Sequence, residues 1–248
     1  MSSNFSGKRK AFLVGLNYKG TSNELHGCEN DVRTMKQRFE NIWKVSPDNI
    51  VMKMDGELTQ ENGFINHFDE MTKEASAGDL FFLHYSGHGF QIKDDNHDEA
   101  DGYDEAIMLN TSYVRDDEIS NVLKKLPEKT TVCMIFDCCH SGTMADLPFL
   151  YSRGKEYRYA NYDSYKCDVV AISGCTDSGT SADAWIDGKG SYGALTAMLL
   201  DVFDESDANT TWKQVIDKTV VKVKKAGYKQ VPQFSATRQD LINSKVIV

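Results

Sequence analysis

The chain of 248 residues has little of what marks a disordered, membrane or secreted protein. Only four prolines and 18 glycines occur, which argues against disorder and low complexity. The apolar runs are far too short to cross a bilayer, and none of them follows a basic N-terminus as in a signal peptide. These absences predict a globular, intracellular protein in the cytoplasm, without a membrane partner.

The six cysteines include no CxxC pair, which argues against a zinc site. Without a secretory signal they do not predict a disulfide framework either, so most are expected to be small buried hydrophobic residues. An excess of basic residues is also missing, and the formal net charge of −9 argues against nucleic acid as a partner. That charge is compatible with a basic ligand or a metal ion, although by itself it indicates only solubility.

What the chain does have is a series of apolar runs that alternate with amphipathic segments. The strands are expected at residues 10–16, 49–54, 79–85, 131–136, 168–173 and 233–235. The helices are expected at residues 29–45, 60–75, 116–126, 192–203 and 211–225. This alternation predicts an α/β fold with a mostly parallel central sheet of about six strands and helices on both faces.

One domain, 1–248, is expected, and it divides into two parts. Residues 147–166 are polar and aromatic without clear periodicity, and they are the predicted linker between a larger part, 8–146, and a smaller part, 167–248. Basic side chains in that segment make it a candidate for cleavage by a protease that is selective for basic residues. They are Arg153, Lys155, Arg158 and Lys166.

Two apolar strands end in segments that contain a reactive side chain and glycine. "FFLHYSGHGF" places His88 between Gly87 and Gly89, and "TVCMIFDCCHSGT" places Cys138 and Cys139 after a strand. A lone histidine or cysteine after a strand is more often structural than catalytic. Ligands bind outside the carboxyl ends of parallel strands, however, and an imidazole close to a thiol can generate the thiolate nucleophile. If the two strands are neighbours, these side chains share one edge of the sheet.

These segments resemble the catalytic signatures of caspase-like cysteine peptidases, and the match is closest to the metacaspases, whose pattern is D-x-C-H-S-G. Cys139 follows His88 by about 50 residues, the separation typical of caspases. Further segments that resemble the family occur in family order over nearly the whole chain. They are "LHGCENDV", "DEADGYDEAI", "RDDEI", "DLPFLY", "SGCTDSGTSADA", "GALTAMLL" and "VPQFSAT". The resemblance implies a caspase-like three-layer sandwich.

The resemblance also assigns roles to residues of this chain. His88 would be the general base and Cys139 the nucleophile, and the backbone N–H groups of Gly89 and Cys139 would hold the oxyanion. The acidic pocket that accepts the substrate side chain, S1, would be formed by Cys28, Asp31, Ser86 and Asp137. Such a pocket implies basic peptide or protein substrates, cleaved after arginine or lysine. For Asp31 alone, a favourable place near a helix N-terminus is an equally good explanation.

A third feature is a run of carboxylates, which usually indicates only a solvated loop. The loop contains Asp94, Asp95, Asp98, Glu99, Asp101, Asp104 and Glu105. Many metacaspases need calcium, which binds roughly six to eight oxygen atoms. The resemblance implies Asp116, Asp117 and Asp146 as its ligands, together with one loop residue, for which Asp101 is the candidate.

The sequence therefore predicts a calcium-stimulated cysteine endopeptidase, expected to act as a monomer. The short linker favours a type I-like organisation, although the proline-rich or zinc-finger prodomain of many type I members does not occur in this sequence. One alternative is a catalytically silent homologue that acts as a regulatory or binding protein, but such homologues usually lack the cysteine or the histidine. Another is a zinc- or redox-active protein that uses the pair Cys138–Cys139, although vicinal cysteines rarely form a relaxed disulfide.

Overall fold

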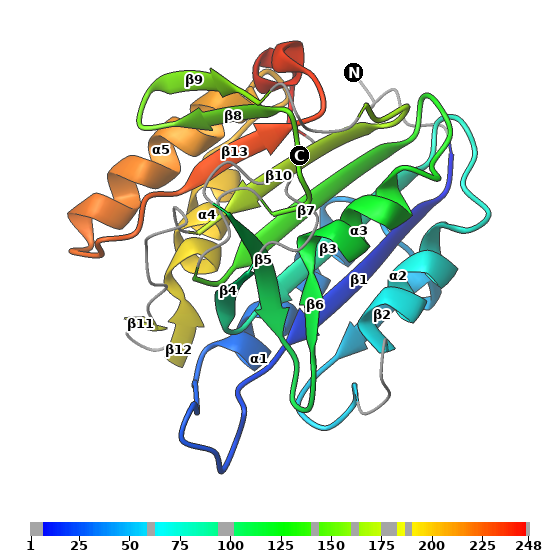
Figure 1. Cartoon of the computed structure of the whole chain (residues 1–248). Helices are drawn as coiled ribbons and strands as arrows, with labels where there is room; N and C mark the ends of the chain where they lie inside the picture. Colours follow the sequence, from blue (N-terminus) through cyan, green and yellow to red (C-terminus); the bar gives the residue numbers. More distant parts are fainter. Residues whose placement is uncertain are drawn as a thin grey trace.

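The computed structural model of the chain describes residues 7–58, 63–93, 102–139, 144–159, 164–174, 183–186 and 190–246. Its centre is a sheet of eight strands in the order β2-β1-β3-β7-β10-β13-β8-β9 (Figure 1). The first five strands in this order are parallel, and β13, β8 and β9 continue the sheet as antiparallel neighbours. The bounds are β1 Arg9–Gly15, β2 Ile50–Lys53, β3 Leu80–Ser86, β7 Thr131–Asp137, β10 Asp168–Ser173, β13 Gln233–Ala236, β8 Phe149–Ser152 and β9 Lys155–Arg158.

Helices cover both faces of this sheet because alternate side chains of its central strands are apolar on both sides. On one face lie α1 Cys28–Asn41, α4 Ala194–Asp204 and α5 Trp212–Lys225, and on the other lie α2 Gly63–Thr72 and α3 Asp116–Leu123 (Figure 1). Within β3, Phe82 packs toward the first group of helices, whereas Phe81 and Leu83 pack toward the second. The structure is thus the expected α/β three-layer sandwich.

Two smaller sheets extend from the central one. The first contains β4 Gly89–Lys93, β5 Tyr103–Met108 and β6 Tyr113–Arg115, and it begins directly after the end of β3. The second is the hairpin of β11 Asp183–Ile186 and β12 Gly190–Gly193, which leads into α4. Short 3-10 helices at Pro47–Asn49 and Gln239–Asn243 complete the described elements. No helix in the described ranges is both long and apolar enough to cross a membrane.

The six strands expected from the sequence are all present in the central sheet, but the sheet has eight. The two additional strands, β8 and β9, lie inside the predicted linker, so this segment contains regular strands that its lack of periodicity did not predict. All four residues of β8 are buried, whereas all four of β9 are exposed at the edge of the sheet. Lys155 and Arg158, two of the basic residues proposed as cleavage sites, therefore lie in a paired strand.

Candidate active site

The ends of β3 and β7 bring the histidine and cysteine segments together. The two strands are parallel neighbours in which Ser86 pairs with Asp137, and the backbone N–H of Gly87 donates to the carbonyl of Asp137 at 3.2 Å. His88 and Cys139 each follow two residues after this paired position. The condition that the two strands be neighbours is therefore met, and both residues lie at the same edge of the sheet.

The glycines on either side of His88 are required by close neighbours. A Cβ atom at Gly87 would lie 2.5 Å from the hydroxyl oxygen of Tyr85 and 2.7 Å from that of Tyr18. A Cβ atom at Gly89 would lie only 2.1 Å from the carbonyl oxygen of Cys139. Any side chain at either position would overlap these atoms. The segment after β3 therefore contacts the segment after β7 directly, through the backbone of Gly89.

His88 is held by contacts to its ring and to its backbone. Its Nε2 lies 2.7 Å from the carbonyl oxygen of Asn23. A carbonyl oxygen can only accept, so Nε2 must carry the proton, and Nδ1 is then the nitrogen that can take up a proton from another group. The hydroxyl oxygen of Tyr18 accepts the backbone N–H of His88 at 3.0 Å, and the hydroxyl of Tyr85 donates to its carbonyl at 2.8 Å.

The two adjacent cysteines differ in burial. Cys138 is fully buried in the core on the α2/α3 side of the sheet, whereas Cys139 is partly exposed. Cys28, Cys133 and Cys167 are buried as expected from the composition, while Cys175 lies outside the described residues. Burial raises the pKa of the Cys133 thiol to about 12, so this thiol stays protonated at neutral pH. Among the described cysteines, only Cys139 combines partial exposure with a position at the carboxyl end of the sheet.

Two buried carboxylates meet beside the same edge of the sheet. The Asp31 carboxylate accepts the hydroxyl of Ser86 at 2.6 Å and the backbone N–H of Gly193 at 3.0 Å. Asp137 accepts the backbone N–H of Thr196 at 2.7 Å. A Cβ atom at Gly193 would lie 2.2 Å from Asp137 Oδ2 and 2.8 Å from Asp31 Oδ2, so the turn before α4 touches both carboxylates.

The start of α4 explains how these two acids tolerate burial. The carboxylates of Asp31 and Asp137 are 0% and 2% exposed, yet they accept N–H groups at a helix N-terminus, where the helix dipole favours negative charge. The structure thus brings together three of the four residues predicted for S1, namely Asp31, Ser86 and Asp137. The fourth, Cys28, is the first residue of α1, one turn before Asp31, and it is buried.

Two of the residues expected to bind calcium, Asp116 and Asp117, begin α3. Asp116 is its first residue, is 1% exposed and accepts the backbone N–H groups of Glu105 and Asp117. Asp146 is also buried, and the Tyr165 hydroxyl donates to the carbonyl of Ala145 beside it.

These carboxylates have the chemistry of calcium ligands, but they do not form a complete site. Within the described ranges, no three His, Cys, Asp or Glu side chains lie together closely enough to hold a metal ion. Asp101, the loop residue expected to complete the site, lies outside those ranges.

Comparison with known proteins identifies the family. Residues 9–148 match the model "Metacaspase, peptidase C14 domain", which includes His88, Cys139 and all four residues predicted for S1. The chain belongs to the metacaspase family. It is 31% identical to Metacaspase-1 of Yarrowia lipolytica over 99% of this chain and 65% of that protein. It is 34% identical to Metacaspase-2 of Trypanosoma brucei brucei over 92% of this chain and 73% of that protein.

A solved structure of a protein from Geobacter sulfurreducens shows the same fold as this metacaspase chain. It aligns with a TM-score of 0.71 and 24% identity over 98% of this chain and all of that one. The α/β sandwich expected from the sequence is therefore confirmed, both by the arrangement of the strands and helices and by this likeness.

Several residues around the metacaspase site were not found by sequence reasoning. Tyr18 and Asn23, from the segment after β1, contact His88, and Gly193 and Thr196, at the start of α4, bind the buried carboxylates. Asn23, Gly193 and Thr196 make these contacts through backbone atoms, which every residue type has, so their identity in the sequence gives no signal. Tyr18 could have been suspected, because it follows the strand that lies beside β3 in the sheet.

Proposed function

We propose that this chain is a cysteine endopeptidase in which Cys139 is the nucleophile and His88 moves the protons. The observation that carries the proposal is the placement of His88 and Cys139 at matching positions after two adjacent parallel strands. The difference in burial supports Cys139 over Cys138. Membership of the metacaspase peptidase family supports the reaction class.

The chemistry follows from the tautomer of His88. With Nε2–H donated to Asn23, Nδ1 accepts the thiol proton of Cys139, and the thiolate attacks the carbonyl carbon of the peptide. The backbone N–H groups of Gly89 and Cys139 would stabilise the oxyanion of the tetrahedral intermediate. The imidazolium then protonates the leaving amine, which breaks the C–N bond and leaves a thioester. His88 next deprotonates a water molecule that hydrolyses the thioester and restores the thiol.

The proposed specificity is for arginine or lysine at P1, the substrate residue before the cleaved bond. Asp31 and Asp137 would pair with the guanidinium or ammonium group, because two carboxylates beside each other repel unless a positive charge joins them. Both are buried in this structure, so a substrate side chain can reach them only after the covering residues move.

Calcium is proposed as an activator. The carboxylates of Asp116, Asp117 and Asp146 would hold it, completed by Asp101 from the loop before β5. Bound calcium would supply positive charge that offsets the repulsion among these acids. The buried positions of Asp116 and Asp146 support this proposal, because a buried carboxylate needs strong interactions to remain charged.

The decisive experiment is hydrolysis of fluorogenic peptides that carry Arg, Lys or Asp at P1. The rates are measured over a series of calcium concentrations that increase in 10-fold steps, and again in excess EGTA without added calcium. Wild type should cleave the Arg and Lys peptides several-fold faster with calcium, and it should leave the Asp peptide intact. Cys139→Ala should lose all activity, whereas Cys138→Ala should keep much of it. Equal calcium responses of Asp116→Asn and wild type would contradict the proposed ligands.

The main competing function is a catalytically silent regulatory or binding protein. It predicts no hydrolysis of any peptide by wild type at any calcium concentration, even when Cys139 reacts with iodoacetamide. The presence of both His88 and Cys139 at the ends of paired strands favours the enzyme. Cleavage after aspartate, by contrast, would agree with the proposed peptidase activity. It would overturn only the proposal that Asp31 and Asp137 recognise the P1 side chain.

A further inference from the structure

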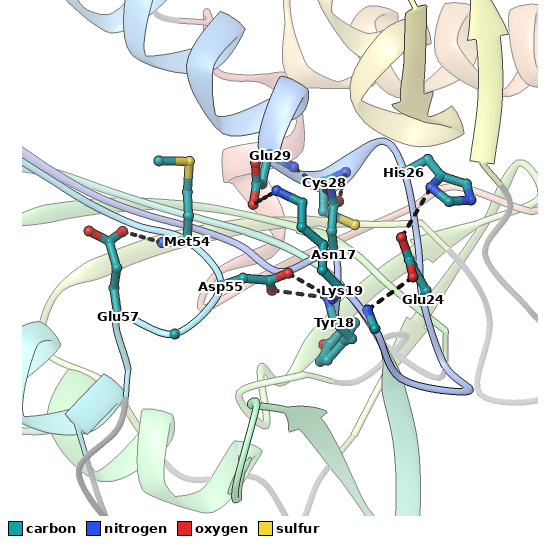
Figure 2. A network of polar contacts seen from close by, with 12 residues as sticks. Asn17, Tyr18, Lys19, Glu24, His26, Cys28, Glu29, Met54, Asp55 and Glu57 are labelled. Carbon is teal, nitrogen blue, oxygen red and sulfur yellow. Dashed lines mark hydrogen bonds and ion pairs between the residues drawn. The ribbon is translucent and has the colours of Figure 1, made fainter.

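Tyr18 lies at the start of the segment that follows β1, in an unusual backbone conformation. Its φ of +51° is in the left-handed region, which residues other than glycine rarely adopt. The carboxylate of Asp55 accepts the backbone N–H groups of Tyr18 and Lys19, each at 2.9 Å (Figure 2). Figure 2 also shows Lys19 paired with Glu29 of α1. Asp55 therefore holds the strained backbone of Tyr18, and α1 holds the side chain of the next residue.

This conformation places the tyrosine side chain beneath His88. The Tyr18 ring lies against the His88 imidazole, with ring centroids 4.9 Å apart and planes tilted by 34°. Its hydroxyl oxygen accepts the backbone N–H of His88 and lies 2.9 Å from the hydroxyl of Tyr85. The same hydroxyl can donate to the carbonyl of Met108 at 2.8 Å. One side chain thus contacts both the ring and the main chain of His88.

The two tyrosine hydroxyls fix a turn that would otherwise have wide conformational freedom. His88 stands between two glycines, which restrict the backbone less than any other residue. The hydroxyl of Tyr18 receives the N–H of this residue, and that of Tyr85 can donate its one proton to the C=O of His88 at 2.8 Å or to that of Met108 at 2.6 Å. Both hydroxyls stay protonated, because burial raises the pKa of Tyr18 and of Tyr85 above the ordinary value.

We infer that Tyr18 is a positioning residue for His88: its hydroxyl fixes the backbone of the histidine, and its ring fixes the orientation of the imidazole toward Cys139. This inference rests on the proposed function, in which His88 takes the proton of Cys139. A small displacement of a proton-transfer group costs rate without weakening substrate binding. The loss should therefore fall on kcat rather than on KM.

The test is Tyr18→Phe, which keeps the ring but removes the hydroxyl. The matched control is Tyr151→Phe, because Tyr151 is also buried and its hydroxyl donates to Asp217 at 2.7 Å, remote from His88 on strand β8. We expect kcat of Tyr18→Phe to fall about 5- to 10-fold with KM unchanged, the range for loss of one hydrogen bond that aligns a reacting group. Tyr151→Phe should keep the wild-type kcat and KM.

A second readout does not depend on hydrolysis. The rate of Cys139 alkylation by iodoacetamide, measured by mass spectrometry from pH 5 to 9, reports how well His88 supports the thiolate. In Tyr18→Phe the midpoint of this profile should shift to higher pH, and in Tyr151→Phe it should match wild type. His88→Ala gives the limit expected when the imidazole is absent.

The outcomes separate this inference from the proposed function. If wild type hydrolyses no peptide but Tyr18→Phe still shifts the alkylation profile, the proposed function fails and the positioning role stands. If wild type is active and Tyr18→Phe matches it in kcat and in the alkylation profile, the positioning role is overturned. It is equally overturned if Tyr18→Phe lowers thermal stability but leaves kcat and the alkylation profile unchanged.

Discussion

At the scale of the residue, the glycines beside His88 show how close contacts decide which residue types the site accepts. Sequence reasoning attributes such glycines to freedom of the backbone and to N–H groups that face a ligand. The structure adds a second reason, because the positions of their missing Cβ atoms are already filled. Gly87 faces the hydroxyls of Tyr18 and Tyr85, and Gly89 faces the backbone of Cys139.

Gly87→Ala tests this steric requirement. The added methyl group would overlap two hydroxyls on rigid rings, so we expect a loss of about 1–3 kcal/mol in the free energy of unfolding and a strong loss of peptidase activity. Urea denaturation and peptide hydrolysis would measure the two effects.

The control is Gly227→Ala, at a glycine with φ +85° and no atom within 4 Å of the added methyl group. Its backbone strain should cost roughly 1–3 kcal/mol while activity is retained. Wild-type activity of Gly87→Ala would contradict this requirement. It would mean that Tyr18 and Tyr85 can move away from the added methyl group without any effect on His88.

At the scale of the element, the central strands and the edge strand β2 were predictable, whereas the antiparallel strands β8 and β9 and contacts between distant segments were not. β3 and β7 are continuous apolar runs because both faces are covered by helices. β9 has four exposed residues, Lys155–Arg158, and it exists only because its backbone pairs with β8. The same limit applies to the site, since Asn23 contacts His88 through a backbone carbonyl.

The segment after β1 should act as one unit, anchored by Asp55. Because the Asp55 carboxylate accepts the N–H groups of both Tyr18 and Lys19, Asp55→Asn replaces one acceptor oxygen by a donor that faces an N–H. We expect kcat to fall in the same direction as in Tyr18→Phe, with a loss of about 1–2 kcal/mol in the free energy of unfolding.

Glu57→Gln is the matched control for this variant. Glu57 accepts the backbone N–H of Met54 at 2.7 Å in the same loop, and Figure 2 shows it joined to Met54 rather than to Tyr18. Steady-state kinetics should therefore show the wild-type kcat for Glu57→Gln. If Asp55→Asn behaved like Glu57→Gln, the anchoring of Tyr18 by Asp55 would be irrelevant to catalysis.

At the scale of the whole molecule, the sheet divides the hydrophobic core into two halves. Next to the candidate active site, this core also contains buried polar side chains. His84 is on β3, two residues before Ser86, and is fully buried with its Nε2 3.2 Å from the hydroxyl of Thr196. The backbone N–H of the same Thr196 binds Asp137. A histidine in an apolar strand was predictable from the sequence, but its place beneath the buried carboxylates depends on how α4 packs.

This burial should make the stability of the whole fold depend on pH. Burial lowers the pKa of His84 from an ordinary value near 6.5 to about 3, so between those values the unfolded chain binds a proton that the folded chain does not. Stability is therefore lost as the pH falls from about 6.5 toward 3. Between pH 6.5 and pH 4.5 the contribution amounts to about 2–3 kcal/mol.

His84→Gln removes this titration and leaves an amide that can bond to Thr196. Urea denaturation from pH 7 to 4.5 should show a shallower loss of stability in His84→Gln than in wild type, by the 2–3 kcal/mol estimated above. His67→Gln is the graded control, because His67 on α2 is only half-buried and burial lowers its pKa as well. It should remove a smaller part of the slope. Identical slopes in wild type and His84→Gln would contradict the lowered pKa of His84 in the folded chain.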